Sequence, residues 1–378
     1  MRVLLGTLAA LLVLAGCGGT AAPHRPSPGS PPAGPSSPIV PSAGAVSPGP
    51  PGAPPPRVLG TVADHLKTPW GIAFLPDGSA LVTERDTGRV LRLHGPGDHR
   101  ATPVGHVRVV SVPGGESGLL GIAVSPSYSR DHRVFLYACR SSGNEVLRGT
   151  LRHGRLGRLA PILRGIPHGA IHNGGRLAFG PDGSLYVSTG ETGDSRLAQD
   201  RGSLGGKILR ITRSGQPAPG DPFPGSPVWT YGHRNVEGLA FDPSGRLWAT
   251  EFGQDTWDEI NLIRRGRNYG WPIVEGRASG HPKLVNPKVQ WHTDLASPSG
   301  LAYAAGSLWA GALRGERLWQ VPLHGRRTGK PEGWFSGRYG RLRTVVRAPD
   351  GRLWVTTSNT DGRGNPGPRD DRILLVRP

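Results

Sequence analysis

Residues 177–188 read Leu-Ala-Phe-Gly-Pro-Asp-Gly-Ser-Leu-Tyr-Val-Ser. A short apolar run precedes Pro-Asp-Gly, and a run rich in residues that favour strands follows it. Asp-Gly is typical of a tight hairpin turn, because glycine readily adopts the positive φ that such a turn needs. Tyrosine and valine favour strands. The stretch therefore predicts two antiparallel strands joined by a tight turn.

The same sequence motif recurs five more times in the chain, and its fifth copy is degenerate. The other copies start at Gly71, Gly121, Gly238, Gly300 and Val345. Five intervals separate Pro76 of the first copy from Pro349 of the sixth, so the mean spacing is about 55 residues. A four-stranded propeller blade with long loops has roughly that length. The repeat predicts an all-β chain, a six-bladed β-propeller over residues 58–378, with a two-sheet sandwich as the alternative.

Composition narrows the function classes. The chain has 378 residues, 59 of them Gly and 39 Pro with a single Met, which argues against a helical bundle. No G-x-G-x-x-G follows a strand and no P-loop is present, so nicotinamide and nucleoside-triphosphate chemistry have no support. The formal net charge is +18, but 40 of the 45 basic residues are Arg, a bias that genome composition also produces. We therefore expect no nucleic-acid partner, although the charge suits anionic ligands or an anionic surface.

The N-terminal residues have the pattern of an exported lipoprotein. An apolar run from Val3 to Leu14 is too short to span a membrane, and Leu14-Ala15-Gly16-Cys17 resembles the bacterial lipobox. Residues 1–16 are predicted to be a signal peptide and Cys17 the lipidated residue, a plain secretory signal being the alternative. Residues 17–57 hold 14 prolines and predict a Pro/Ser/Gly-rich tether. The protein is expected outside the cytoplasm, anchored to the outer face of the bacterial membrane.

Polar, Gly-rich insertions accompany the third copy of the repeat. They include Ile171-His172-Asn173-Gly174-Gly175-Arg176 and Gly190-Glu191-Thr192-Gly193-Asp194. We expect His172 on one strand and Glu191 at the end of the next, so that the hairpin brings the two side chains together. A His oriented by a carboxylate is a standard general base. On spacing alone, a surface His with an incidental acidic neighbour remains an equal alternative.

A second group of insertions accompanies the fourth copy, at 231–235, 251–261 and 268–272. Asp258 and Glu259 lie in this group, either as metal ligands or as a brace held through Arg side chains. Tryptophans are divided between repeat and insertions. Trp257 and Trp271 are candidates to flank a sugar, whereas repeat positions predict that Trp248, Trp309 and Trp354 are blade core. Cys139, His168 and His233 are expected to be structural.

These segments resemble the PQQ-dependent aldose sugar dehydrogenases of the glucose/sorbosone dehydrogenase family. Besides the insertions, the resemblance is carried by the stretches 68–74, 116–123, 205–210, 313–315 and 340–343. It covers essentially all of 58–378 in order. The family fold is a six-bladed propeller, which agrees with the repeat count.

The resemblance implies oxidation of an aldose at C1 to a lactone, with PQQ and Ca²⁺ as cofactors. It assigns His172 as the general base, Glu191 as the carboxylate that holds it, and Arg234 as the cation beside the reactive quinone carbonyls. Asn235 matches a neighbouring cofactor contact. No C-x-x-C-H haem motif is present, so the electrons are expected to leave to a separate acceptor.

The resemblance also implies how the cofactors are held. The backbone carbonyls of Gly253 and Gln254 match calcium ligands, and oxygen is the donor that Ca²⁺ prefers. Basic side chains match those that pair with the cofactor carboxylates, where Arg offers bidentate donors; these are Arg314, Arg341 and Arg343. Leu197 and Glu116 fall at positions that line the cofactor or the sugar.

Departures from the family pattern concern cofactor affinity more than fold. Gln254 replaces a Pro, and Val236-Glu237 stands where Pro-Gln is frequent. A carboxylate at Glu237 suits an anionic cofactor only if an Arg pairs with it. Two rival functions remain: a calcium-dependent lactonase, which would need acidic and Asn ligands on the axis, and a non-catalytic cell-surface propeller that binds carbohydrate or protein.

Overall fold

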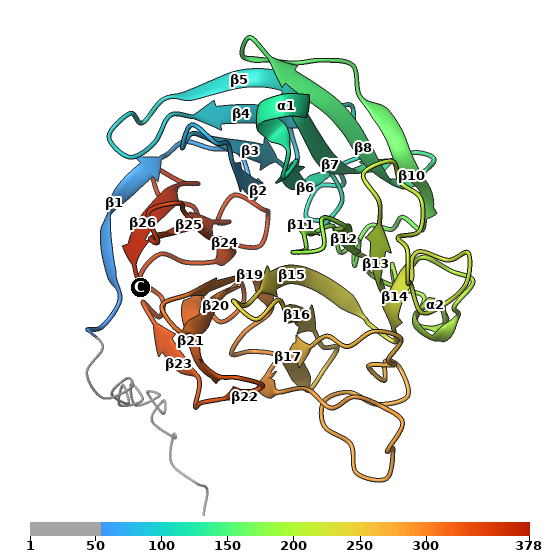
Figure 1. Ribbon diagram of the computed structural model, residues 1–378. Coiled ribbons are helices and arrows are strands. Elements are labelled where there is room, and N and C mark those ends of the chain that lie inside the picture. The colour runs from blue at the N-terminus through green and yellow to red at the C-terminus, as the bar shows by residue number, and fades with distance from the viewer. Residues whose placement is uncertain (1–53) are drawn as a thin grey trace, which may run out of the picture. The chain divides into compact units, whose positions relative to one another are not determined.

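The computed structural model describes residues 54–378, which form six small sheets arranged in a ring around a central axis (Figure 1). The all-β, six-bladed prediction is thereby confirmed. The predicted signal peptide, Cys17 and the tether up to residue 53 lie outside the described residues. The first strand begins at Arg57, one residue inside the predicted tether.

Each of the first three blades carries a copy of the repeat on its two innermost strands. Blade 1 consists of β2 (Pro69–Phe74), β3 (Ala80–Glu84), β4 (Arg89–Leu93) and β5 (Ala101–His106). Blade 2 consists of β6 (Leu119–Val124), β7 (Arg133–Arg140), β8 (Gly143–Arg152) and β10 (Ala160–Ile166), and β9 (Arg155–Leu156) pairs with β8. Blade 3 consists of β11 (Leu177–Phe179), β12 (Leu185–Ser188), β13 (Lys207–Ile211) and β14 (Val228–Tyr231).

The remaining blades repeat this order. Blade 4 consists of β15 (Asn235–Phe241), β16 (Leu247–Phe252), β17 (Trp257–Leu262) and β18 (Val289–His292). Blade 5 consists of β19 (Pro298–Ala304), β20 (Ser307–Ala312) and β21 (Arg317–His324), and β21 pairs with both β22 (Arg327–Thr328) and β23 (Glu332–Trp334). Blade 6 consists of β24 (Leu342–Arg347), β25 (Leu353–Thr357), β26 (Ile373–Arg377) and β1 (Arg57–Ala63).

Blade 6 closes the ring by pairing the two ends of the propeller. β1 lies antiparallel to β26, with Arg57 opposite Arg377 and Ala63 opposite Ile373. Backbone hydrogen bonds between the first and last strands leave no gap in the ring. The described residues also contain two four-residue helices, α1 (Tyr128–Asp131) and α2 (Arg196–Gln199), and no helix among them is long and apolar enough to cross a membrane.

The repeat behaves as the sequence predicted. The turn glycines Gly78, Gly183, Gly245 and Gly351 all have φ between +72° and +85°, the region that a side chain disfavours. Trp248, Trp309 and Trp354 are at most 1% exposed, which confirms that they are blade core. Cys139 lies fully buried on β7, where burial raises the pKa of its thiol to about 12.

In blades 1 to 5, one position on the second strand lies against the backbone of the next blade. The Thr83 hydroxyl accepts the Gly71 N–H at 2.8 Å and donates to the Leu120 carbonyl of blade 2 at 2.5 Å. At the equivalent position of blade 3, the Ser188 hydroxyl donates to the Val236 carbonyl of blade 4 at 2.7 Å. The contact joins neighbouring blades where the register of the inner strands shifts, so it satisfies backbone groups that the ladder leaves unpaired.

Blades 2, 4 and 5 meet their neighbours at this same position, whereas blade 6 meets blade 1 through the Thr344 hydroxyl on its first strand, which donates to the Trp70 carbonyl. Thr250 donates to the Ser299 carbonyl of blade 5 at 2.5 Å, and the Tyr137 hydroxyl donates to the Asn173 carbonyl at 2.9 Å. In blade 5 the residue is Gly311, and a Cβ there would lie 2.6 Å from the Arg343 carbonyl of blade 6. Only glycine allows that approach.

Arg176 fills the axis that these contacts surround. Its Nε donates to the Glu237 carbonyl at 2.7 Å, its Nη2 lies 3.2 Å from the Thr344 hydroxyl, and its guanidinium carbon stacks 4.1 Å from the Trp70 ring centroid. Burial lowers the pKa of Arg176 to about 9. One side chain therefore links blades 1, 3, 4 and 6 at the centre of the ring.

The contact from Thr250 makes a prediction about stability. Thr250→Val keeps the shape but leaves the buried Ser299 carbonyl without its donor, so the free energy of unfolding should fall by about 1–3 kcal/mol. Thr250→Ser keeps the hydroxyl and should cost less. Chemical denaturation measures both, with the exposed Thr102→Val as control. Equal stability of Thr250→Val and the unchanged chain would contradict this role.

Candidate active site

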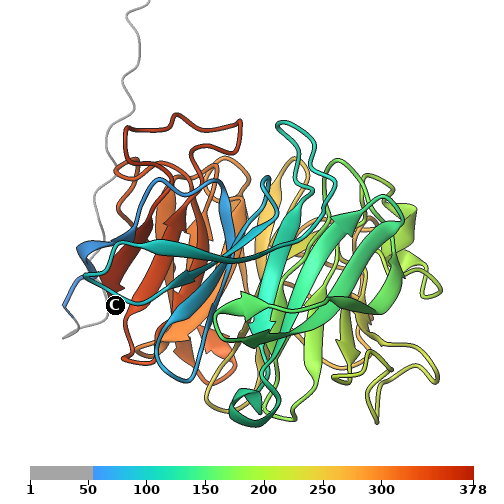
Figure 2. The ribbon, with the colours of Figure 1, turned by 90° about the horizontal axis from the view of Figure 1, so that it is seen from above.

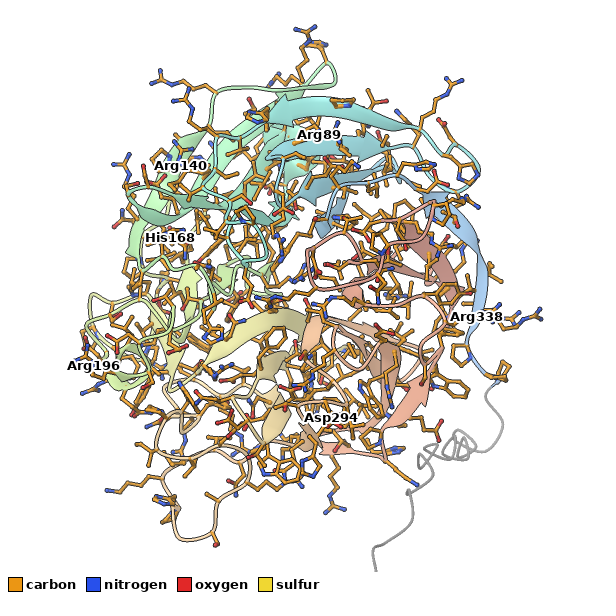
Figure 3. All side chains as sticks on the ribbon, turned by 180° about the vertical axis from the view of Figure 1, so that it is seen from behind. Arg89, Arg140, His168, Arg196, Asp294 and Arg338 are labelled. Carbon is orange, nitrogen blue, oxygen red and sulfur yellow. The ribbon has the colours of Figure 1, made fainter. Side chains whose placement is uncertain are left out.

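The antiparallel order of each blade places its loops at two opposite ends of the ring (Figure 2). We call the site end the one that holds the loops between second and third strands and the loops between blades. The far end holds the turns between first and second and between third and fourth strands, except that the long β17–β18 connection of blade 4 also reaches the site end, where its Glu275 contacts the β16–β17 loop. The sequence-predicted site residues lie in the loops and strand ends of the site end, as do the six residues labelled in Figure 3.

His172 and Glu191 lie side by side, as predicted, but the reason differs. His172 is not on a strand: it lies in the loop before β11 with φ +52°, and Glu191 lies three residues after β12. The expectation of a strand-borne His172 is therefore wrong, because Gly174 and Gly175 also take positive φ and turn the chain before β11 begins. His172 Nδ1 contacts Glu191 Oε1 directly, and both residues are buried.

Glu116 holds the backbone of His172. Its Oε2 accepts the His172 N–H at 2.8 Å, and its Oε1 pairs with Arg363 Nη1 at 2.9 Å. Burial alone would raise the pKa of Glu116, but the His172 N–H and Arg363 outweigh burial and hold the pKa below its usual value. A charged carboxylate thus fixes the loop conformation that presents the His172 ring.

Arg234 provides a cation with unused donors. Its backbone N–H donates to Glu251 Oε1 at 2.6 Å, while its guanidinium lies 5.5 Å from the Trp271 ring centroid. The buried Nε of Arg234 has no hydrogen-bond partner within the described residues. Burial lowers the pKa of this guanidinium, although the carboxylates of Glu191 and Glu116 act in the opposite direction. The side chain is suited to a negatively charged ligand.

Arg341 and Arg343 share carboxylate partners at the floor of the site. Asp361 Oδ2 accepts from Arg341 Nε at 3.0 Å and from Arg343 Nη2 at 3.4 Å. Glu237 Oε2 accepts from Arg343 Nη1 at 2.9 Å and from the Ser299 hydroxyl at 2.6 Å. The sequence analysis required an Arg partner for the Glu237 carboxylate if the site is to hold an anionic cofactor. Arg343 is that partner.

The loop between β16 and β17 turns its amides toward one carboxylate. Glu275 Oε1 accepts the N–H groups of four consecutive residues, Gln254 to Trp257, at 2.8–3.0 Å. Asp258 Oδ1 accepts the Gly253 N–H at 2.9 Å. The carbonyls of Gly253 and Gln254 accept no hydrogen bond within residues 54–378. The loop therefore offers two free oxygen donors, which suits a hard cation.

Asp258 and Glu259 brace this region rather than form a metal pair. Asp258 Oδ2 accepts the Ser297 N–H at 2.6 Å, and Glu259 Oε1 accepts the Gly276 N–H at 2.9 Å. The partners are backbone amides, so the expectation of Arg partners is wrong. His233 is structural as predicted, since it is fully buried between Thr230 and Glu251.

The remaining predicted residues differ in how deeply they are buried and in what they contact. Asn235 is buried and its Oδ1 accepts the Gly174 N–H at 2.9 Å, so it also supports the His172 loop. Leu197 lies half-buried on α2, and Arg314 lies exposed in the loop after β20. Lys207, which the sequence did not single out, donates from Nζ to the Leu197 and Gly205 carbonyls at 2.6 Å and fastens the loop that carries Glu191.

Several further residues escaped the sequence interpretation. Glu251 lies at the end of β16, and Asp361 and Arg363 follow β25. An acidic residue at the end of each of these repeats could have identified the first two. Glu275 lies 20 residues from the loop it holds, and no local pattern reveals that contact.

Comparison with known proteins agrees with this geometry. A model of the glucose / sorbosone dehydrogenase family matches residues 66–375. This chain belongs to the glucose/sorbosone dehydrogenase family.

Relatives within the family share the whole propeller. The PQQ-bound aldose sugar dehydrogenase of Streptomyces coelicolor is 53% identical, with a TM-score of 0.83 over 86% of this chain and 99% of that one. A putative oxidoreductase (glucose dehydrogenase) of Thermus thermophilus is 42% identical, with a TM-score of 0.80 over 85% of this chain and all of that one. Aldose sugar dehydrogenase YliI of Escherichia coli is 30% identical over 79% of this chain and 89% of its own length.

Glu259 makes a prediction about pH. Burial, reinforced by the neighbouring Glu251 carboxylate, raises the pKa of Glu259 from 4.5 to about 8. Between these values the folded chain holds a proton that the unfolded chain releases, so the free energy of unfolding should fall as pH rises. The slope from this carboxyl is at most about 1.4 kcal/mol per pH unit.

Denaturation at a series of pH values, with a chelator present, measures this slope. Glu259→Gln should flatten it, whereas the exposed Asp294→Asn should leave it unchanged. An identical pH dependence in the Glu259→Gln variant would show that Glu259 does not hold the proton.

Proposed function

We propose that this member of the family oxidises aldose sugars at C1 to lactones, with PQQ and Ca²⁺ as its cofactors, and passes the electrons to a separate acceptor. The observation that carries the proposal is the contact of His172 Nδ1 with the buried Glu191 carboxylate. With Nδ1 donating to Glu191, Nε2 is the proton acceptor, and it has no hydrogen-bond partner within the described residues.

The residues of this chain then have separate tasks. His172 Nε2 takes the proton of the anomeric hydroxyl while the C1 hydrogen leaves with its electron pair, and the C1–O bond becomes a carbonyl. Glu191 stabilises the imidazolium that results, and Glu116 keeps the ring in place. When bound, PQQ supplies a quinone that accepts hydride, and Ca²⁺ supplies a Lewis acid.

The arginines differ in how many N–H donors they have left for an anionic cofactor. Arg341 uses Nε and Nη2 on Asp361, which leaves Nη1 free, and Arg314 is exposed with no ion pair within the described residues. Arg343 uses Nε, Nη1 and Nη2 on Ser358, Glu237 and Asp361. We infer that Arg234, Arg314 and Arg341 bind the cofactor, and that Arg343 mainly sets the charge of the floor. The free Gly253 and Gln254 carbonyls are the proposed calcium ligands.

Reconstitution tests the proposed function and the role of His172 together. The purified chain, given PQQ, Ca²⁺ and glucose-type aldoses, should reduce an artificial dye only when both cofactors are present. His172→Ala should lower turnover by at least about 100-fold, because general-base catalysis contributes that much, while PQQ still binds.

Three outcomes would overturn this assignment. Unchanged turnover in His172→Ala removes the base. Absence of PQQ binding at saturating Ca²⁺ removes the dehydrogenase and leaves a binding propeller. Hydrolysis of lactones without PQQ would support the lactonase instead, although Arg176 rather than acidic side chains fills the axis.

Arg341 makes a separate prediction about cofactor affinity. Arg341→Ala removes a buried cation with a free donor, so the dissociation constant for PQQ should rise by about 10- to 100-fold, as expected for the loss of a charge-assisted hydrogen bond. Quenching of intrinsic fluorescence by PQQ measures it, and the exposed Arg338→Ala serves as control. Equal affinity in both variants would exclude Arg341 from the cofactor site.

We further propose that the chain is exported and acylated at Cys17. The support is the lipobox-like Leu14-Ala15-Gly16-Cys17 and the proline-rich stretch that follows. The intact mass of the mature chain, isolated from membranes, distinguishes acylated Cys17 from a plain cleaved signal.

A further inference from the structure

The far end of the propeller concentrates unpaired positive charge. Exposed arginines with no carboxylate partner within the described residues come from several blades there; they include Arg152, Arg155, Arg158, Arg326, Arg327 and Arg347. Four carboxylates in the turns between first and second strands at this end are already neutralised. Asp77, Asp182, Asp242 and Asp350 pair with Arg92, Arg210, Arg246 and Arg352 at 2.5–2.6 Å.

A hollow at the far end combines these charges with aromatic rings. It has a volume of about 330 Å³ and lies where blades 3, 4 and 5 approach one another. Arg264 and Arg326 line it together with Trp229 and Phe241. Guanidinium groups bind phosphate oxygens through paired N–H donors, and aromatic side chains with a polar edge are favoured at the boundary between water and lipid. The lining is suited to a phosphate headgroup.

The chain before the propeller also enters at this end. β1 begins at Arg57, opposite Arg377 at the end of β26, and both residues lie at the far end because β26 runs away from the site-end loop that precedes it. The 56 residues before Arg57, which include the predicted Cys17, therefore join the propeller on its basic side. The candidate active site opens on the opposite side.

We propose that the far end is a docking surface for an anionic phospholipid membrane. The basic turns contact the headgroups, the hollow beside Arg326 takes a phosphate, and the site end stays turned toward the solution. Attraction of clustered arginines to an anionic bilayer adds with each charge and weakens with salt. The proposal is independent of the sugar-oxidising function, since it uses none of that site's residues.

Vesicle binding tests the proposal on the chain that begins at residue 18, which lacks both the predicted signal peptide and any acyl anchor. The chain should bind vesicles of equal parts phosphatidylglycerol and phosphatidylcholine, and should not bind phosphatidylcholine alone. The far-end variant Arg152→Glu, Arg155→Glu, Arg327→Glu should bind the anionic vesicles at least about 100-fold more weakly, as expected from the contribution of each basic residue near such a surface.

A matched variant at the site end separates location from total charge. Arg140→Glu, Arg196→Glu and Arg338→Glu, all labelled in Figure 3, reverse the same number of charges and should change binding little. Thermal unfolding shows that both variants are folded. Equal loss in the two variants, binding to phosphatidylcholine alone, or equally tight binding to duplex DNA at the same salt would each overturn the proposal, the last because it would mark a general polyanion surface.

Discussion

The hydrogen bonds from the inner strands of one blade to the backbone of the next are the constraint on which this propeller depends. Each blade alone is a small sheet with two open edges, and a single repeat cannot bury its apolar faces without its neighbours. Thr83, Ser188 and Thr250 donate across the seam to carbonyls that a shifted register leaves unpaired. Because these bonds lie near the site-end starts of the first strands, they also fix the inner strands from which the site loops emerge.

That framework explains how loops can hold buried charge. His172, Glu191 and Arg234 come from loops attached to rigid strand ends, and each is held by a second polar group. The arrangement separates two kinds of cation. Arg343 is neutralised by Glu237 and Asp361 and belongs to the floor of the site. Arg234, in contrast, keeps a buried Nε donor that has no partner within the described residues. Such an uncompensated donor is costly in a folded protein unless a ligand satisfies it, which is why we connect it to an anionic cofactor.

The sequence predicted the blades because their repeat is local: hairpin turns and core tryptophans recur with a fixed spacing. It also predicted that His172 and Glu191 meet, but not how, because positive φ at His172 depends on tertiary contacts with Glu116. Glu275 and the seam contacts could not be predicted, since their partners lie in distant loops or other blades. The sequence identified Glu237 only as a departure from the family pattern. That its charge is neutralised became clear only from the position of Arg343 in the structure.

The central claim is that the site end between His172, Arg234 and Arg341 is where the cofactor binds. The most direct measurement is a crystal structure of the chain soaked with PQQ and Ca²⁺. The account predicts density for PQQ in contact with Arg234 and Arg341, beside the His172 ring, and a Ca²⁺ ion on the carbonyls of Gly253 and Gln254. PQQ bound elsewhere on the propeller, or this site left empty at saturating PQQ, would contradict it.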